Sequence, residues 1–408
     1  MTTYNRGFRR FAILNMISAF GPISRTRLSD ISGFRPATVG EVAKELLDDG
    51  LVAETGFSAS GAGRRRTMLE VNRPAIGAVG IAIASDRVSA VLATLDGAIH
   101  REETCPRSPG ADSCALAAAI GERVERLLKA ARGITVVGIG IGEPPYDPAA
   151  YERHVPFVAN YDHFNDWVRL ELKAALTDRF RLPVHTLSAV TLPALVERQF
   201  GAVRDARNIL CIELSNGIGA SIIAGGTPVS GANGVAGELG HTVVDLNDRQ
   251  RCYCGKTGCA ELGAAFPELV QALRQAMDRG AHTELTYDAL TPEGLAEALA
   301  RGEPLACHYV GQAARRAGTA IANAVNLLNP EVVVLYGYML KLGEPYLEAV
   351  RSAIRENTLE LARGFEICAS LDLESKTPLG AAAEVFSRFL RRNEFQWVYN
   401  MTGGEETP

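Results

Sequence analysis

One histidine and three cysteines in a single short segment constrain this chain more than any other feature. They form the pattern His-x10-Cys-x-Cys-x4-Cys, which consists of His241, Cys252, Cys254 and Cys259. Three thiolates and an imidazole make a closed tetrahedral shell for Zn2+, and Gly255 and Gly258 permit a tight loop between the ligands. A closed shell leaves no open position for water, so we expect a structural zinc ion that orders the loop. The alternative is that these cysteines are buried together by coincidence.

The rest of the chain favours metal binding over disulfides. The other five cysteines are scattered along the sequence. The N-terminal MTTYNRGFRRF lacks the apolar stretch of a signal peptide. No apolar run reaches the roughly 18–20 residues that a membrane span needs. We therefore expect a cytoplasmic protein with no membrane partner, and clustered thiols in a reducing compartment typically bind metal.

Residues 1–75 predict a winged helix-turn-helix domain. Apolar spacing predicts a helix over 8–20, and Ser24 and Gly33 are suited to begin and end a second short helix. A third helix is expected over 36–49, because proline suits the first helical turn. Two short strands, 51–54 and 67–71, flank the segment SASGAGRRR. Three helices followed by a basic hairpin are typical of a DNA-binding winged helix.

Charge points to the same partner. The first 75 residues carry 11 basic and 7 acidic side chains, a net charge of +4, whereas the whole chain carries −5. We expect the third helix to enter the major groove of double-stranded DNA and the wing arginines to meet phosphates or the minor groove. The candidate DNA-binding residues are Arg25, Arg27, Arg35, Thr38, Glu41, Lys44, Arg64, Arg65 and Arg66. The alternatives are a winged-helix module that binds protein, or simply a small helical domain.

From residue 77 onward the pattern alternates between strands and helices, which predicts an α/β body with two lobes around a cleft. We expect a first lobe over 76–188, completed by a C-terminal helix over 378–392. A second lobe is expected over 189–377, with strands at 209–214 and 331–335 and a long helix at 305–328. Residues 393–408 form a tail to which no role is assigned.

The stretch GELGH…CYCGKTGCAE resembles the signature of the ROK family of repressors, open reading frames and sugar kinases, and the resemblance extends to Leu379-Gly380-Ala381-Ala382. It implies that the body has the actin-like fold of sugar kinases and hexokinases, with the four zinc ligands named above. It also implies that Glu238, His241 and Glu261 bind the hydroxyls of a sugar-like effector. Ser188, which begins the Ser188-Ala189 pair where family kinases have Asn-Asp, is a further candidate effector contact.

The elements that family kinases use for phosphoryl transfer are altered here. Alanine at position 189 cannot accept a proton from a sugar hydroxyl. The first phosphate turn is replaced by Ala82, Ala84, Ser85 and Asp86, and an aspartate repels phosphate. In Tyr336-Gly337-Tyr338, two bulky tyrosine side chains stand where the adenosine of ATP would pack. The best preserved element, 215–220, is interpreted as a plain hairpin turn. We therefore expect that this protein is not an enzyme.

The sequence thus predicts a transcriptional repressor, a homodimer or homotetramer, that is controlled by a sugar or sugar-derived effector in a body without catalysis. The altered residues also remove one or two hydroxyl contacts, so the effector differs from the usual hexose or is absent. The alternative is an effector-independent regulator or scaffold whose body serves only for oligomerisation.

Overall fold

The computed structural model describes residues 6–57, 66–84, 87–107, 113–143, 167–232 and 235–391. The chain divides into two compact units. The first unit contains Met1–Ile141, Leu172–Thr186 and Ala381–Pro408, and the second contains Gly142–Glu171 and Leu187–Gly380. Among the helices in the described ranges, none combines the length and the apolar character that crossing a bilayer requires.

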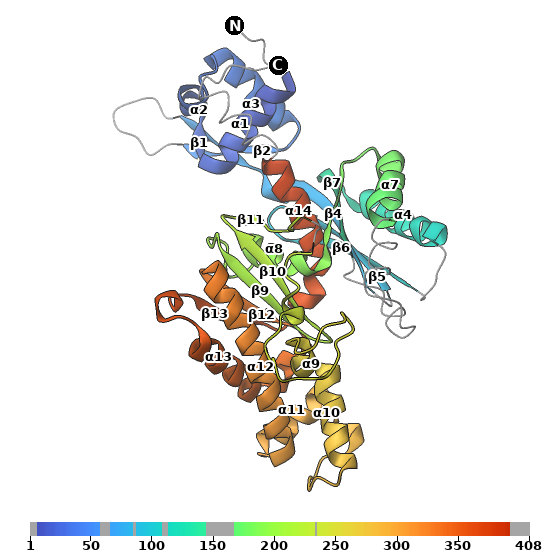
Figure 1. Ribbon diagram of the computed structural model, residues 1–408. Coiled ribbons are helices and arrows are strands. Elements are labelled where there is room, and N and C mark those ends of the chain that lie inside the picture. Colours follow the sequence, from blue (N-terminus) through green and yellow to red (C-terminus); the bar gives the residue numbers. More distant parts are fainter. Residues whose placement is uncertain are drawn as a thin grey trace. The chain divides into compact units, whose positions relative to one another are not determined.

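The first unit begins with three helices and a small antiparallel sheet of order β1-β3-β2 (Figure 1). The elements are α1 (Arg6–Phe20), β1 (Ile23–Ser24), α2 (Arg25–Ser32), α3 (Pro36–Asp48), β2 (Val52–Phe57) and β3 (Thr67–Val71). The Ser24 side chain accepts a hydrogen bond from the Arg27 backbone N–H at 3.3 Å, and Gly33 ends α2 with a φ of 68°. The three predicted helices and both strands are confirmed. The wing tip, residues 58–65, lies outside the described residues.

One apolar core joins these helices to the sheet. One face of α3 packs inward, since Val39, Val42, Ala43 and Leu46 are buried. Buried side chains on α1, α2 and β3 complete this core, namely Ile13, Ile17, Leu28 and Leu69. Burial of these faces leaves the opposite side of α3 in solvent.

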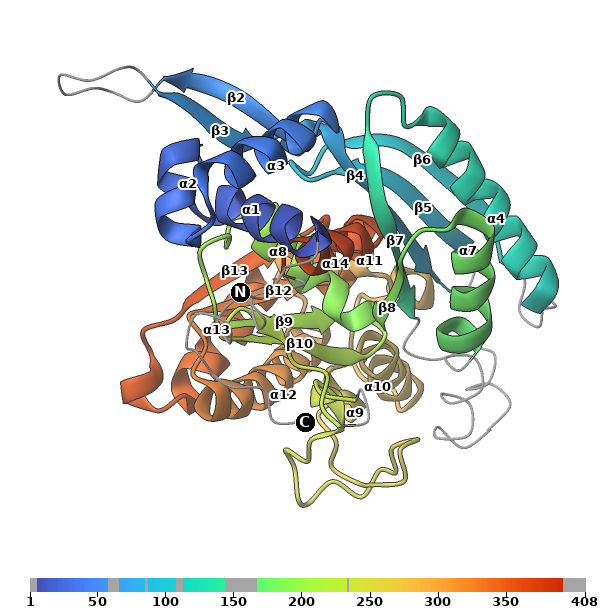
Figure 2. The same cartoon turned by 90° about the horizontal axis from the view of Figure 1, so that it is seen from above.

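A five-stranded sheet of order β6-β5-β4-β7-β8 follows. Its strands are β4 (Ile76–Ile83), β5 (Arg87–Thr94), β6 (Ile99–Pro106), β7 (Thr135–Glu143) and β8 (Val184–Ser188). Strands β4, β5 and β6 pair in antiparallel order and form a meander. Helices α4 (Ser113–Ala130) and α7 (Lys173–Phe180) lie side by side (Figure 2), joined by an Arg179–Glu125 ion pair of 2.7 Å. A π-helical segment, η2 (Trp167–Leu172), directly precedes α7.

The last helix, α14 (Thr377–Arg391), lies directly against β7. A Cβ atom at Gly140 would stand 2.0 Å from the Ala381 carbonyl oxygen. This close backbone approach is open only to glycine, because any side chain would meet the turn of α14. Gly140 and Ala381, which are far apart in the sequence, therefore pack against each other within the first unit.

The second unit is built on a sheet of order β11-β10-β9-β12-β13. Its strands are β9 (Ile209–Leu214), β10 (Ile218–Ala224), β11 (Thr227–Pro228), β12 (Val332–Tyr336) and β13 (Glu366–Ser370). Strands β9, β12 and β13 are parallel, whereas β9 and β10 form an antiparallel hairpin. The predicted strands over 209–214 and 331–335 are thereby confirmed, the second displaced by one residue.

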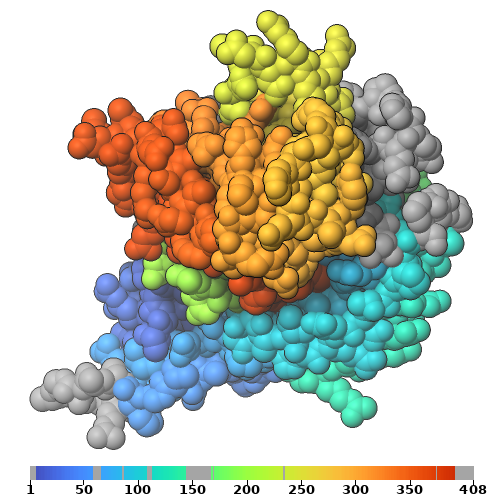
Figure 3. Space-filling model, turned by 90° about the horizontal axis from the view of Figure 1, so that it is seen from below, coloured from blue at the N-terminus to red at the C-terminus, as the bar shows by residue number. Residues whose placement is uncertain are grey.

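Helices pack against this sheet and against one another. They are α8 (Leu192–Gln199), α9 (Glu261–Ala264), α10 (Phe266–Asp278), α11 (Pro292–Ala300), α12 (Pro304–Leu328) and α13 (Glu344–Asn357). Short helical turns include η3 (Ala189–Thr191), η4 (Leu239–His241), η5 (Tyr287–Ala289), η6 (Tyr338–Leu342), η7 (Glu360–Ala362) and η8 (Leu373–Lys376). Figure 3 shows α10, α11 and α12 as one continuous surface in gold and orange. The long helix α12 buries Ala317 and Ile321 in the same apolar core as Leu210 and Val333.

We expect Gly140→Ala to destabilise the first unit by about 1–3 kcal/mol, because the added methyl group forces β7 and α14 apart. Denaturant unfolding followed by circular dichroism measures the change. Gly364→Ala is the matched control, since a Cβ at Gly364 meets no atom within 4 Å. Equal stability of the two variants would contradict the close approach.

Candidate functional site

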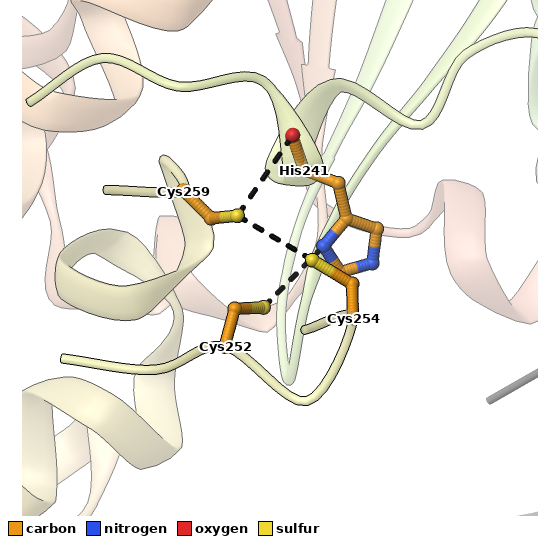
Figure 4. A group of neighbouring side chains, drawn as sticks. All are labelled: His241, Cys252, Cys254 and Cys259. Atoms are coloured by element: carbon orange, nitrogen blue, oxygen red, sulfur yellow. Dashed lines mark hydrogen bonds between the residues drawn. The ribbon is translucent and has the colours of Figure 1, made fainter. Parts of the chain in front are cut away.

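The predicted metal ligands come together in one cluster (Figure 4). The ligand atoms of His241, Cys252, Cys254 and Cys259 all lie within 4.8 Å of one another. Cys254 Sγ is 3.6 Å from Cys259 Sγ, and Cys252 Sγ is 3.6 Å from His241 Nδ1. Ligands bound at about 2.3 Å in a tetrahedron lie roughly 3.8 Å apart. The four side chains could therefore hold one metal ion.

Backbone pairing brings the two ends of this loop together. The Ala260 N–H donates to the Thr242 carbonyl at 2.9 Å, and the Val244 N–H donates to the Gly258 carbonyl at 2.9 Å. Both loop glycines have positive φ, 90° at Gly255 and 73° at Gly258, as the sequence predicted. At Gly258 a Cβ would also stand 2.1 Å from the Asp245 carbonyl oxygen.

Two basic side chains hold the cluster from outside. The Lys256 ammonium donates to the His241 carbonyl at 2.7 Å. The Arg316 guanidinium, on α12, donates to the Cys259 carbonyl at 2.9 Å and to Asp248 at 2.6 Å. These hydrogen bonds tie the ligand loop to the core of the second unit. The charge assistance in such bonds makes them stronger than neutral ones.

Burial sets the protonation states of the cluster. Burial raises the pKa of the Cys252 and Cys259 thiols, and the adjacent Cys254 adds to the effect. Burial first, and then the charge of Lys256, lowers the pKa of His241. A neutral imidazole has a free lone pair for a metal, whereas the thiols must lose protons when an ion binds. Metal binding is therefore coupled to proton release.

Three of the four predicted effector residues lie together beside the metal ligands. His241 Nε2 is 3.8 Å from a carboxylate oxygen of Glu238, while Nδ1 points toward Cys252. Glu261 accepts a hydrogen bond from the Ile218 N–H at 3.1 Å. Burial raises the pKa of both carboxyl groups, and at Glu238 the charge of Glu261 raises it further. The imidazole thus joins a sulfur cluster on one side to a carboxylate pair on the other.

The fourth predicted effector residue, Ser188, is the last residue of β8 and is half-buried. Ala189 begins η3 directly after it. Its assignment to the effector site stays a prediction.

Other side chains of the protein pack around the loop between β9 and β10. The Tyr338 hydroxyl donates to the Asn216 side chain, and the Tyr338 N–H donates to Ser215 Oγ at 3.3 Å. The ring of Phe266 meets the Tyr338 ring edge-on at a centroid distance of 5.4 Å. Because β9 and β12 are parallel neighbours, their following loops emerge at the same end of the sheet. Tyr338 therefore fills the space beside residues 215–220, which were interpreted from the sequence as a plain hairpin turn.

Ala82, which the sequence comparison placed at the first phosphate turn, lies within β4 and pairs with Ser89 of β5. Ala84 follows that strand, and its carbonyl accepts a hydrogen bond from the buried Arg107 at 2.8 Å. Ser85 and Asp86 lie outside the described residues.

Most candidate DNA-binding side chains are accessible. Arg27, Arg35, Glu41 and Lys44 are exposed, and Thr38 is half-buried. Arg25 forms an ion pair of 2.8 Å with Glu54. Such a surface pair contributes only about 0–1 kcal/mol, so Arg25 can exchange it for a phosphate.

The wing residues are only partly described. Arg66 is exposed and directly precedes β3. Arg64 and Arg65 lie outside the described residues. Contacts between this surface and DNA stay a prediction.

Sequence reasoning missed three side chains at this site, which are Tyr253, Lys256 and Arg316. Tyr253 OH lies 3.0 Å from His241 Nε2. Its place between two ligands was the only signal available in the sequence. Arg316 is distant along the chain and is brought in by the fold of α12, so no local pattern could have identified it.

The sequence model of the ROK family matches residues 78–386. The xylose repressor of Caldicellulosiruptor bescii is 28% identical over 82% of this chain and 84% of its own length. The N-acetylglucosamine repressor of Escherichia coli O157:H7 is 28% identical over 92% of this chain and 91% of its own length.

Solved structures show the same fold. A ROK family transcriptional regulator, a homologue of the Escherichia coli MLC protein, superposes with a TM-score of 0.75. It is 23% identical and covers 98% of this chain and 99% of its own. The ROK hexokinase of Thermus thermophilus, 27% identical, has a TM-score of 0.63 over 76% of this chain and 98% of its own. The predicted fold class, a winged helix-turn-helix followed by a sugar-kinase-like body, is confirmed.

We expect Cys254→Ser to lose its metal to a chelator under conditions in which the wild type retains it, because one of four ligands is removed. The melting temperature of the second unit should fall, while the N-terminal helices stay folded. Elemental analysis and calorimetry measure both effects. Cys307→Ser is the matched control, since that thiol is exposed on α12. Full metal content in Cys254→Ser would show that this ligand assignment is wrong.

Proposed function

Because this chain belongs to the ROK family, we propose that it is a DNA-binding transcriptional repressor whose kinase-like body responds to a sugar or sugar-derived effector. The repressors that it resembles are named for xylose and N-acetylglucosamine. These names support a carbohydrate effector without identifying it.

The N-terminal winged helix carries this proposal. The ROK match begins only at residue 78, after the three helices and the small sheet. A match over 92% of this chain to the N-acetylglucosamine repressor must extend into that winged helix. The exposed side of α3, with Arg35 and Lys44, is suited to the major groove, and Arg66 lies next to the wing. A kinase needs no such domain.

In the body, we assign a structural zinc ion to His241 and the three cysteines. Thiolate-rich, closed sites of four ligands are typical of structural zinc. The effector is assigned to Glu238, Glu261 and His241 Nε2, since a carboxylate can accept hydrogen bonds from two adjacent hydroxyls. The imidazole would then contact the ion and the effector through different nitrogens, so that zinc fixes the ring orientation.

We further propose that the body does not transfer phosphate. Ala189 offers no proton acceptor, and Tyr338 fills the space beside the loop after β9. ATP-dependent phosphorylation of any sugar by the purified protein, lost in Glu238→Gln, would overturn this part of the proposal.

A winged-helix regulator usually binds two half-sites as a symmetric dimer, so we propose a homodimer or homotetramer. Sedimentation of the purified protein measures the assembly. The competing function is an effector-independent regulator whose body serves only for assembly. The two functions differ in whether any small molecule weakens DNA binding.

The decisive experiment recovers genomic fragments bound by the purified protein and then tests which metabolite releases them. D-xylose, D-glucose, N-acetyl-D-glucosamine and their phosphates form the first panel. We expect at least one to raise the melting temperature by binding the native state and to lower DNA affinity. Bound fragments that no sugar releases, together with no melting shift, would favour the effector-independent regulator.

We expect replacement of Arg64, Arg65 and Arg66 by alanine to weaken binding to all DNA sequences alike. The slope of log affinity against log salt should decrease by about 0.9 for each arginine that contacts a phosphate. Arg274, Arg279 and Arg301, which are exposed in the second unit, provide a control with the same loss of charge. An unchanged slope in the wing variant would argue against phosphate contacts there.

A further inference from the structure

The loop that carries the metal ligands also places a phenol among the proposed effector residues. Tyr253 lies between Cys252 and Cys254, and its hydroxyl is 3.0 Å from His241 Nε2. The two rings meet edge-on, with a centroid distance of 5.0 Å and an interplanar angle of 84°. The same phenol hydrogen-bonds Glu261, which helps to lower the pKa of that carboxyl group against the effect of burial.

The Tyr253 hydroxyl provides a hydrogen-bond partner for the side chains that are proposed to bind the effector. His241 and Glu261 are each only 9% exposed, so their polar atoms require partners within the protein or from a ligand. A phenolic hydroxyl provides one donor and acceptor lone pairs, as a sugar hydroxyl does. The arrangement of His241 and Glu261 is therefore stabilised by a side chain that offers the same donor and acceptor as one sugar hydroxyl.

Resting on the effector role proposed above, we propose that Tyr253 is an internal substitute for an effector hydroxyl, and that an effector must displace its phenol from His241 and Glu261. The Tyr253 side of this contact has room to move, because the residue is 40% exposed. Its neighbour Cys252 is 4% exposed and is hydrogen-bonded through its backbone to Lys256, so the backbone there is anchored. Rotation of the Tyr253 side chain into solvent vacates the site without moving the ligand cysteines.

Two consequences follow for recognition. Effector affinity is reduced by competition with the phenol, and a ligand must present a hydroxyl that satisfies both the imidazole and the carboxylate. Because the backbone on either side of Tyr253 is anchored, its release changes the side-chain surface of the metal loop while the ligand cysteines keep their positions.

Calorimetry on the full-length, metal-loaded protein tests this inference, with D-xylose, D-glucose and N-acetyl-D-glucosamine as probes. The variant Tyr253→Phe keeps the ring and removes the hydroxyl. We expect it to bind whichever of these sugars the wild type binds, about five- to tenfold more tightly than the wild type does. This factor corresponds to the loss of one competing hydrogen bond. Tyr253→Ala should also bind more tightly than the wild type. Tyr287→Phe is the matched control, because its phenol is exposed and donates to Asp278 instead.

A spectroscopic readout separates displacement from a structural role of the ring. Sugar binding to the wild type should give a tyrosine ultraviolet difference signal that is missing in Tyr253→Phe. Equal affinity in the wild type and Tyr253→Phe would overturn the inference while leaving the effector role intact. Weaker binding by Tyr253→Phe would show that the hydroxyl contacts the sugar directly, which also overturns it. If neither the wild type nor any variant binds these probes, the effector role fails, and this inference with it.

Discussion

The return of the chain from Cys259 to His241 is the constraint on which the candidate site depends. Two backbone hydrogen bonds and the Arg316 guanidinium hold these distant positions together, and Gly258 allows the approach. As a result, the imidazole stands between the thiol cluster and the carboxylates of Glu238 and Glu261, with a different nitrogen toward each side. A metal ion in the cluster would lock this orientation, because an imidazole bound through Nδ1 cannot flip its ring. The proposed metal site and the proposed effector site therefore share one side chain.

The winged helix and the body use different physical means to meet their ligands. On α3 the polar face is exposed, and Arg25, at the start of α2, forms an ion pair with Glu54 at the surface. A polyanion can displace such a weak pair at little cost. In the body the polar groups are buried and hydrogen-bonded, so a ligand must replace existing partners. Salt should therefore affect DNA binding far more than effector binding.

Local chemistry explains which predictions succeeded. Ser24, Gly33 and Pro36 mark helix ends through their own backbone preferences, so the boundaries of α2 and the start of α3 could be read from sequence. The ligand spacing is equally local. The π-helical segment η2 and the hydrogen-bond partners of Arg316 depend on tertiary packing, and no pattern within a short window encodes them. The role of Tyr253 depends on both, since its position was visible but its hydrogen-bond partners were not.

On the proposal that the body transfers no phosphate, the contact between Tyr338 and Asn216 bears on how such an activity could be engineered into it. Open α/β sheets bind ligands in the crevice outside the carboxyl ends of parallel strands, and these two residues follow β9 and β12 there. A carboxylate introduced at position 189 would leave the phenol in that crevice. Replacing Tyr338 alone would leave position 189 without a proton acceptor. An engineered phosphoryl transferase would therefore need both changes in the same chain.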